Sequence, residues 1–406
     1  MNISFKVSAL AVCISSLLAC SEPSIKQTEV AMSGEQLAQK YIIIDGHIDV
    51  PYRLEGKWDD VTKATADGDF DYPRAKAGGL NAPFMSIYIP AAFELNGGSK
   101  QLADKLIDSV ESIVNSAPEK FAIATSVSDV KKHFQQGLIS LPMGMENGSP
   151  IEGKIENLQH FYNRGVRYIT LTHSKTNHIS DSSYDPLRPA SGLTNFGKSL
   201  VKEMNHIGMM IDVSHISDDA FYQVMSITKA PVIASHSSVR KFTPGFERNM
   251  SDDMLLKLKE NGGVIQINFG SGFISQAALE HRNTYKVKLN EFMTQNTVTP
   301  NSDEVKAFKQ EYLSNSPFPF ASLDDVLDHF DHVVNLIGID HVGIGSDYDG
   351  VGDSLPINLK DVSSYPNLID GLLKRGYSEQ DIEKILSGNV FRVWQQVENF
   401  SNTHRN

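Results

Sequence analysis

Cysteine is almost absent from this sequence. Its two cysteines, Cys13 and Cys20, both lie within the first twenty of 406 residues. The rest of the chain therefore cannot form an internal disulfide, and it offers no thiolate as a nucleophile or metal ligand. Any metal ion in the body of the protein would have to be held by histidine, aspartate and glutamate.

Positive charge is also scarce. The 37 lysines and arginines face 49 aspartates and glutamates, which gives a formal net charge of −12, and no long basic run occurs. Nucleic-acid binding needs a basic face that neutralises phosphates, so we expect no nucleic-acid partner. Internal repeats and glycine-rich phosphate-binding signatures are lacking too. Gly343 and Gly345 precede an aspartate and do not open a helix in the required register.

The sequence has no apolar run long enough to span a bilayer. A shorter apolar run lies near the N-terminus, over residues 7–18. It ends in Leu-Leu-Ala-Cys20, which resembles a bacterial lipobox. The alternative is an ordinary secretory signal that happens to contain Cys20. We expect a signal peptide over 1–19, lipidation of Cys20, a flexible tether over 20–33 and a single domain over 34–406. Ser21 after the cysteine favours the outer membrane of a bacterial cell envelope, facing the periplasm, with membrane contact through the anchor alone.

What the chain does contain is a regular alternation of strand and helix patterns. Eight such strands predict an α/β fold, a (β/α)8 TIM-type barrel, because short apolar strands suit a parallel sheet buried on both faces. The alternative is a doubly wound sheet. Residues 270–321 depart from the rhythm and predict an inserted helical excursion after the seventh strand. The predicted strands are 41–47, 81–89, 139–145, 166–172, 209–214, 231–235, 263–269 and 341–346.

Side chains that can bind metal recur at the ends of these strands. Residues i and i+2 of an extended chain point the same way, so His47 and Asp49 should project together. Taken alone, that pair also fits a hydrogen-bonded loop histidine beside a turn aspartate. The recurrence at later strands favours a shared site, because strand ends gather at one mouth of a barrel. The candidates are His47, Asp49, Glu146, His173, His215, His236 and Asp347.

This donor set has its own chemistry. Several imidazoles and carboxylates without sulfur suit one or two first-row divalent ions, with zinc as the first expectation. A carboxylate that bridges two ions reduces their repulsion, and a bridging hydroxide acidified by both becomes a nucleophile near neutral pH. One carboxylate must stay outside the coordination shell to carry a proton to the leaving amine. We predict that Asp347, after the last strand, does so.

Six ordered motifs resemble one known family. They are Asp45-Gly-His47-Ile-Asp49, Met145-Glu146-Asn-Gly, Leu171-Thr-His173-Ser, Ile211-Asp-Val-Ser-His215, Ala234-Ser-His236-Ser and Gly345-Ser-Asp347-Tyr-Asp349-Gly. Together they resemble the membrane (renal) dipeptidase family of zinc peptidases, which belongs to the amidohydrolase-like barrels. The likeness runs from about residue 41 to 400.

The resemblance implies a role for each matching residue. His47 and Asp49 would bind one zinc ion, His215 and His236 a second, and Glu146 would bridge the two. His173 would contact the substrate and polarise the scissile carbonyl or its oxyanion. Arg248, with Arg240 as the alternative, would hold the substrate carboxylate through a paired guanidinium fork. Asp347 would shuttle the proton during hydrolysis of L-L dipeptides and, by extension, L-D dipeptides.

Other interpretations stay open at the level of sequence. The same barrel and metals would serve an amidohydrolase acting on N-acyl amino acids, lactams or lactones. A solute-binding lipoprotein would instead need two lobes and a hinge. A mononuclear deaminase-type barrel expects His-x-His after the first strand, where this chain has Asp49. Asp212 and Asp349 lie close to ligands; we interpret Asp212 as a structural residue or one that supports a ligand, and Asp349 as a turn residue. A homodimer is compatible with the sequence, but a disulfide-linked one is excluded.

Overall fold

The eight apolar strands lie side by side in one parallel sheet. The structure is a computed structural model that describes residues 1–9 and 32–404. The strand order follows the chain, and a parallel bridge between Ile48 and Tyr348 brings the last strand back to the first. The result is a nearly closed (β/α)8 barrel, as the sequence predicts. Its strands are β1 (Ile43–Ile48), β2 (Leu80–Tyr88), β5 (Met143–Glu146), β6 (Val166–Thr170), β7 (Met210–Asp212), β8 (Ile233–Ser237), β9 (Val264–Ile267) and β10 (Val342–Ile344).

Alternate residues of these strands pack on opposite sides of the sheet. Ile44, Phe84 and Tyr168 belong to one apolar cluster, together with Trp394 of the C-terminal helix α17 (Asn389–His404). Their strand neighbours belong to a second and larger cluster. Trp394 is fully buried, and its ring lies 5.3 Å from that of Phe84. The first cluster therefore joins the barrel strands to the C-terminal helix.

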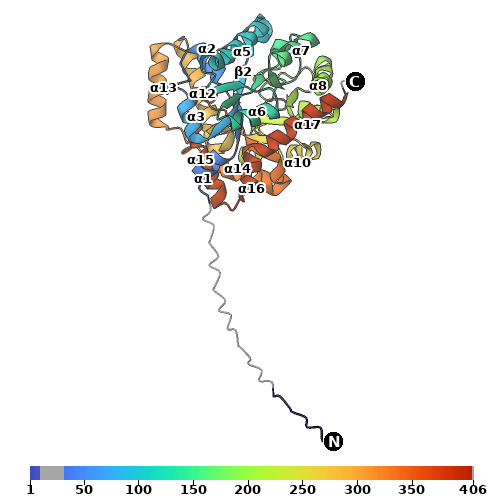
Figure 1. Cartoon of the computed structure of the whole chain (residues 1–406). Helices are drawn as coiled ribbons and strands as arrows, with labels where there is room; N and C mark the ends of the chain where they lie inside the picture. The colour runs from blue at the N-terminus through green and yellow to red at the C-terminus, as the bar shows by residue number, and fades with distance from the viewer. Residues whose placement is uncertain (10–31, 405–406) are drawn as a thin grey trace. The chain divides into compact units, whose positions relative to one another are not determined.

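Helices surround the barrel (Figure 1). Serine side chains cap several of them where the sequence indicates a start, including Ser126, Ser217 and Ser322. The outer helices are α1 (Gly34–Lys40), α2 (Val50–Gly56), α3 (Tyr72–Gly78), α4 (Ala92–Asn96), α5 (Ser99–Ser116), α6 (Val127–Gln135), α7 (Ile155–Asn163), α8 (Asn195–Ile207), α9 (Asp218–Ile227), α10 (Asp252–Asn261), α14 (Leu323–Ile337), α15 (Tyr365–Lys374) and α16 (Glu379–Glu383).

The predicted strand 139–145 is wrong as a single element. It divides at Pro142 into β5 and a separate strand β4 (Ile139–Leu141), which pairs with β3 (Phe121–Ile123) outside the barrel. Proline has no N–H for a ladder, and the Pro142 carbonyl accepts a hydrogen bond from Met85 at the start of the barrel pairing. The short β3 has no periodic pattern that would reveal it.

The predicted excursion after β9 is helical. It contains α11 (Ser271–Ile274), α12 (Gln276–Asn296) and α13 (Asp303–Asn315), and α13 lies at the edge of the fold in Figure 1. The rings of Phe292 and Phe308 stack at 4.5 Å and join α12 to α13. Only Ala278 and Leu279 of α12 are buried, so most of this helix remains accessible.

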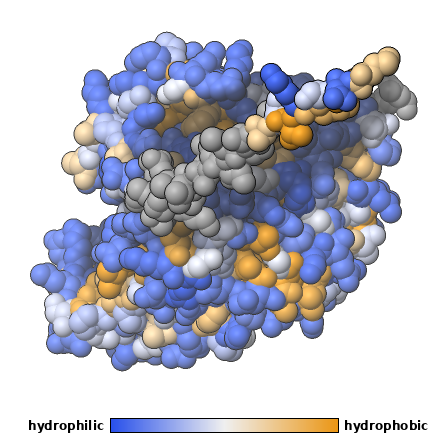
Figure 2. Space-filling model, turned by 60° about the horizontal axis from the view of Figure 1, so that its bottom comes forward, coloured by the Kyte–Doolittle hydropathy of each residue, from blue (hydrophilic) through white to orange (hydrophobic). Residues whose placement is uncertain are grey.

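The N-terminal predictions concern a different part of the chain. Cys20, most of the signal peptide and most of the tether lie outside the described residues. Within the described ranges, no helix combines the length and apolar character that a bilayer crossing requires. The face drawn in Figure 2 is mostly hydrophilic, and its apolar residues form separate groups.

Candidate metal centre

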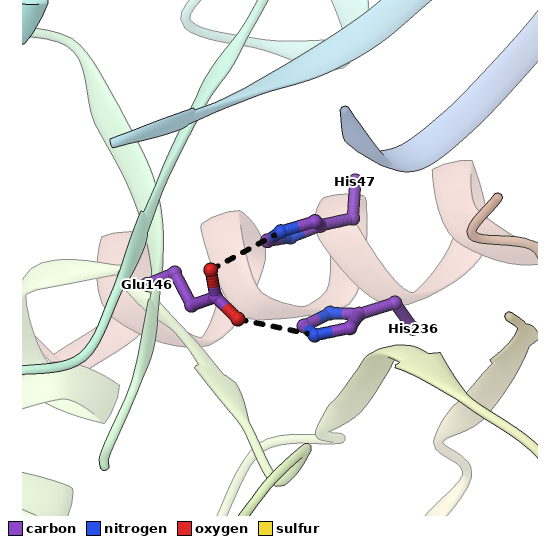
Figure 3. A group of neighbouring side chains, drawn as sticks. All are labelled: His47, Glu146 and His236. Atoms are coloured by element: carbon purple, nitrogen blue, oxygen red, sulfur yellow. Dashed lines mark ion pairs between the residues drawn. The ribbon is translucent and has the colours of Figure 1, made fainter. Parts of the chain in front are cut away.

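Four predicted site histidines surround the carboxylate of Glu146, which ends β5. Its Oε2 lies 3.4 Å from His47 Nε2, and its Oε1 lies 3.2 Å from His236 Nε2 (Figure 3). The Nε2 atoms of His215 and His173 lie 3.1 Å and 3.6 Å from the same Oε1. Side chains from β1, β8 and the loops after β6 and β7 therefore meet around one buried carboxylate, which is only 4% exposed.

The two aspartates complete the cluster on the His47 side. Asp49 Oδ2 lies 3.4 Å from His47 Nε2. Three triads have donor atoms within 4.8 Å of one another, and Glu146 belongs to two of them while His47 also belongs to two. All seven predicted residues are thus brought together. The triads are His47, Glu146 and His236; Glu146, His173 and His215; and His47, Asp49 and Asp347.

Backbone conformation aims two of these side chains. His215 has φ 69° and Asp347 has φ 65°, left-handed values that residues other than glycine rarely adopt. Such a conformation costs on the order of 1 to 3 kcal/mol and gathers at functional sites. Both residues lie just past a strand end, where the turn redirects the side chain over the barrel mouth. The sequence patterns carry no signal of this.

The buried donor atoms fit a metal ion. His47 Nε2 and Asp49 Oδ1 are buried without a hydrogen-bond partner. A buried polar atom that lacks a partner is costly, and native structures contain few of them. Imidazole nitrogens and carboxylate oxygens without sulfur are the donors that zinc and similar divalent ions accept.

Neighbouring hydroxyls orient two of the imidazoles. His47 Nδ1 lies 2.8 Å from the Tyr168 hydroxyl, which itself donates to the Gly46 carbonyl at 3.0 Å. His236 Nδ1 lies 2.7 Å from Ser235 Oγ, which donates to Asp212 Oδ2 at 2.7 Å. In both cases the ring presents Nε2 to the centre, an arrangement that orients metal-binding histidines. The role of Tyr168 was missed in the sequence.

Electrostatics favour the metal-binding forms of His236, His215 and Glu146. His47 differs: burial opposes its charged form, yet Tyr168, Glu146 and Asp49 raise its pKa well above the ordinary value. Burial lowers the pKa of His236 to about 4. Burial and the Arg248 guanidinium lower the pKa of His215 well below its ordinary value. Burial opposes ionisation of Glu146, yet the surrounding imidazoles, those of His173 and His47 first, hold its pKa well below the usual range. Neutral imidazoles beside an ionised carboxylate are the species that coordinate a cation.

Asp347 has the opposite tendency. Burial and the neighbouring Asp49 carboxylate raise the pKa of Asp347 well above its ordinary value. Its Oδ2 accepts a hydrogen bond from Asn268 Nδ2 at 2.7 Å, a contact that the sequence did not reveal. Asp347 can therefore carry a proton while Glu146 stays ionised.

Arg248, rather than Arg240, lies in the site. It is only 3% exposed, and its Nη2 lies 2.9 Å from His215 Nε2 while its Nη1 donates to Ser237 Oγ at 2.7 Å. Arg240 instead forms a two-pronged pair with Asp218, at 2.7 and 2.6 Å. On the other side of the centre, the Tyr88 ring meets the His173 ring edge-on at 4.9 Å.

A cluster of imidazoles and carboxylates at the mouth of a (β/α)8 barrel is typical of a metal-dependent hydrolase. Residues 32–406 match the family model described as membrane dipeptidase, peptidase family M19, and the chain belongs to that family. It is a metallopeptidase, an enzyme that hydrolyses peptide bonds, as the motifs predict.

Individual relatives support this assignment. The chain is 32% identical to dipeptidase 3 of Mus musculus over 387 residues, which cover 93% of this chain and 68% of that protein. It is 36% identical to dipeptidase aclJ of Aspergillus oryzae over 338 residues, or 82% and 70% of the two chains. The crystal structure of the probable dipeptidase PvdM from Pseudomonas aeruginosa is similar with a TM-score of 0.77 and 26% identity, covering 90% of this chain and 98% of that one.

Proposed function

We propose that this protein hydrolyses dipeptides at a centre that holds two zinc ions. The observation that carries the proposal is the position of Glu146, whose two carboxylate oxygens face His47 on one side and His215 and His236 on the other. His47 and Asp49 would hold one ion, His215 and His236 the second, and Glu146 both. When bound, such ions make a water molecule more acidic and polarise a carbonyl.

Asp347 moves the proton in this proposal. Its raised pKa allows it to accept a proton from the attacking water and then to deliver it to the leaving amine. The hydrogen bond from Asn268 fixes one of its oxygens and leaves the other for this transfer. With that proton on its nitrogen, the leaving group departs as an amine when the C–N bond breaks.

His173 and Arg248 position the substrate. Burial lowers the pKa of His173, so the ring is neutral near pH 7 and has one N–H to donate to the oxyanion that develops from the scissile carbonyl. Arg248 would bind the C-terminal carboxylate of the substrate through its guanidinium. A site that binds both the amine and the carboxylate of a dipeptide would exclude longer peptides by geometry.

A metal assay and a substrate panel test the proposal. We expect about two zinc ions per purified chain, loss of dipeptide hydrolysis after chelation, and recovery when zinc is returned. The panel compares L-L dipeptides, L-D dipeptides, N-acyl amino acids and lactams. A protein that binds no metal, or that cleaves only N-acyl amino acids or lactams, would contradict the proposal. Unchanged dipeptide turnover in Arg248→Ala would remove the carboxylate-binding role.

We also propose that the enzyme is anchored in a bacterial cell envelope, facing the periplasm, by a lipid on Cys20. The support is the Leu-Leu-Ala-Cys20 motif after a short apolar run. Cys20→Ala is expected to move the dipeptidase from the membrane fraction to a soluble fraction. Equal membrane retention of the variant would rule the anchor out.

A further inference from the structure

A second arginine lies beside Arg248 at the edge of the metal centre. Arg282 belongs to α12, in the helical excursion, and its Cζ lies 5.2 Å from the ring centre of Phe273 and 5.4 Å from that of Phe246. The Cζ of Arg248 lies 5.5 Å from the same Phe273 ring. The two guanidinium groups therefore share one aromatic neighbour.

Arg282 has no anionic partner among the described residues. No ion pair or hydrogen bond joins it to a carboxylate there, and its Nε is buried without a partner. Burial lowers the pKa of this guanidinium, and Arg248 acts in the same direction. An unpaired, partly buried charge is expensive. It is also unusual in a chain whose acidic residues outnumber its basic residues by 49 to 37.

Aromatic rings connect Arg282 to the metal centre. The Tyr184 ring, 37% exposed, lies 5.9 Å from the ring of His215 and 5.9 Å from that of Phe246. Phe246 stacks on Phe273 at 5.9 Å. The rings of Tyr184, Phe246 and Phe273 form an aromatic wall that runs from the His215 imidazole to Arg282. A guanidinium packed over two rings is held in a fixed plane, which prepares it to receive a carboxylate.

A glycine leaves room for this placement. A Cβ added at Gly272 of α11 would lie 2.9 Å from Arg282 Nη1. Any larger side chain at that position would push against the guanidinium. The local sequence of α11 therefore accommodates Arg282 where it stands beside Phe273.

We propose that Arg282 binds a second carboxylate of the substrate, the side-chain carboxylate of an acidic C-terminal residue. The inference rests on the proposed dipeptidase function. With the main-chain carboxylate on Arg248, the side chain of that residue extends along the aromatic wall toward Arg282. The enzyme then prefers dipeptides that end in aspartate or glutamate over dipeptides that end in a neutral residue of the same size.

The test compares L-Ala-L-Glu with L-Ala-L-Gln, which differ in charge but hardly in shape. In Arg282→Met, which keeps an apolar stem over the rings but removes the charge, kcat/KM for L-Ala-L-Glu should fall roughly 10- to 100-fold. The value for L-Ala-L-Gln should stay unchanged, and KM should account for most of the loss. Arg282→Lys should recover part of the preference.

A matched control distinguishes direct contact between Arg282 and the substrate from a general electrostatic effect of cations on α12. Lys286 is an exposed cation one turn along α12. Lys286→Met should leave the ratio of kcat/KM for the two substrates unchanged. If it lowered kcat/KM for L-Ala-L-Glu as much as Arg282→Met does, direct contact with Arg282 would be contradicted. Equal effects of Arg282→Met on both substrates, or none, would overturn the proposal while dipeptide hydrolysis stands. Failure of the wild-type enzyme on both dipeptides would instead count against the proposed function.

Discussion

His236 is oriented by two hydrogen bonds in series, from its Nδ1 to Ser235 Oγ and from Ser235 to Asp212. Asp212 also accepts hydrogen bonds from the Thr170 hydroxyl at 2.5 Å and from the Ser235 backbone N–H at 2.8 Å. This buried aspartate therefore links β6, β7 and β8 directly beneath the metal centre. Asp212 therefore acts through Ser235 to fix the direction in which the His236 imidazole points.

We expect Ser235→Ala to weaken zinc binding roughly 10- to 100-fold, because His236 loses the partner that orients its ring. Competition with a chelator of known affinity measures the change. Ser86→Ala is the matched control, since Ser86 is a buried barrel serine whose hydroxyl has no partner among the described residues. Equal zinc affinity in the two variants would show that the hydrogen bond has no such role.

For Asp347→Asn we expect kcat to fall about 10²- to 10⁴-fold while the zinc content is retained, because an amide cannot transfer the proton. Metal analysis and steady-state kinetics on the same preparation measure both. A variant that loses zinc would instead identify Asp347 as a ligand of the zinc ion. It would then bind the same ion as His47 and Asp49, with which it forms a triad of donors.

The sequence revealed the residues at the centre better than those that support them. His47, Glu146 and His236 each follow or end an apolar strand, so the barrel topology alone brings them together. Tyr168 lies within such a strand and is 121 positions from His47, and its contact depends on which face of the strand it occupies. Asn268 was missed for the same reason, because nothing local marks its contact with Asp347.

At the scale of elements, the strongly periodic segments were predicted most accurately. Residues 322–337 carry apolar positions at helical spacing, and they form α14, which begins after the capping serine Ser322. The three-residue strand β3 carries no pattern, and Pro142 divides a run that looks continuous. Elements this short depend on contacts with distant partners, which local propensity does not record.

A buried histidine joins α14 to α11 and to the loop after β8. His329 Nδ1 accepts a hydrogen bond from the Val239 N–H at 3.0 Å, and its Nε2 donates to the Ile274 carbonyl at 3.0 Å. Burial lowers its pKa from 6.5 to about 4, with His332 acting in the same direction and Asp325 against it. Between these pH values the unfolded chain binds a proton that the folded chain does not, so stability falls as the pH falls.

Between pH 7 and pH 5, this histidine should reduce the free energy of unfolding by about 2 kcal/mol. His329→Gln, which can donate and accept but does not titrate, should lack that part of the pH dependence. Urea unfolding of both proteins at the two pH values, in the presence of chelator, measures the difference without the contribution of metal release. Identical pH dependence in the two proteins would contradict the assignment.

At the scale of the whole molecule, the body of the enzyme begins at Ser33. Ser33 caps α1, and the backbone N–H of Gly34 donates to Asp370 of α15 at 2.6 Å. The family match likewise begins at residue 32. The second of these contacts joins α1 to the outer helix α15.

A chain that starts at Ser33 should therefore keep the kcat/KM and melting temperature of the longer protein, because every described contact of the barrel is retained. Thermal unfolding and dipeptide kinetics measure this. A shorter chain that starts at Tyr41 is the control. It should melt at a lower temperature, since it lacks α1. A large loss of activity on removal of residues 1–32 alone would show that they support the fold.

The metal centre and the excursion that carries Arg282 are built from separate parts of the chain. The donors come from strand ends that the closed sheet holds in place, whereas α11, α12 and α13 leave the barrel between β9 and α14. Substitutions in the excursion can consequently accumulate over evolution without disturbing the chemistry. Descendants of one ancestral hydrolase can in this way diverge in substrate preference while they inherit the same reaction.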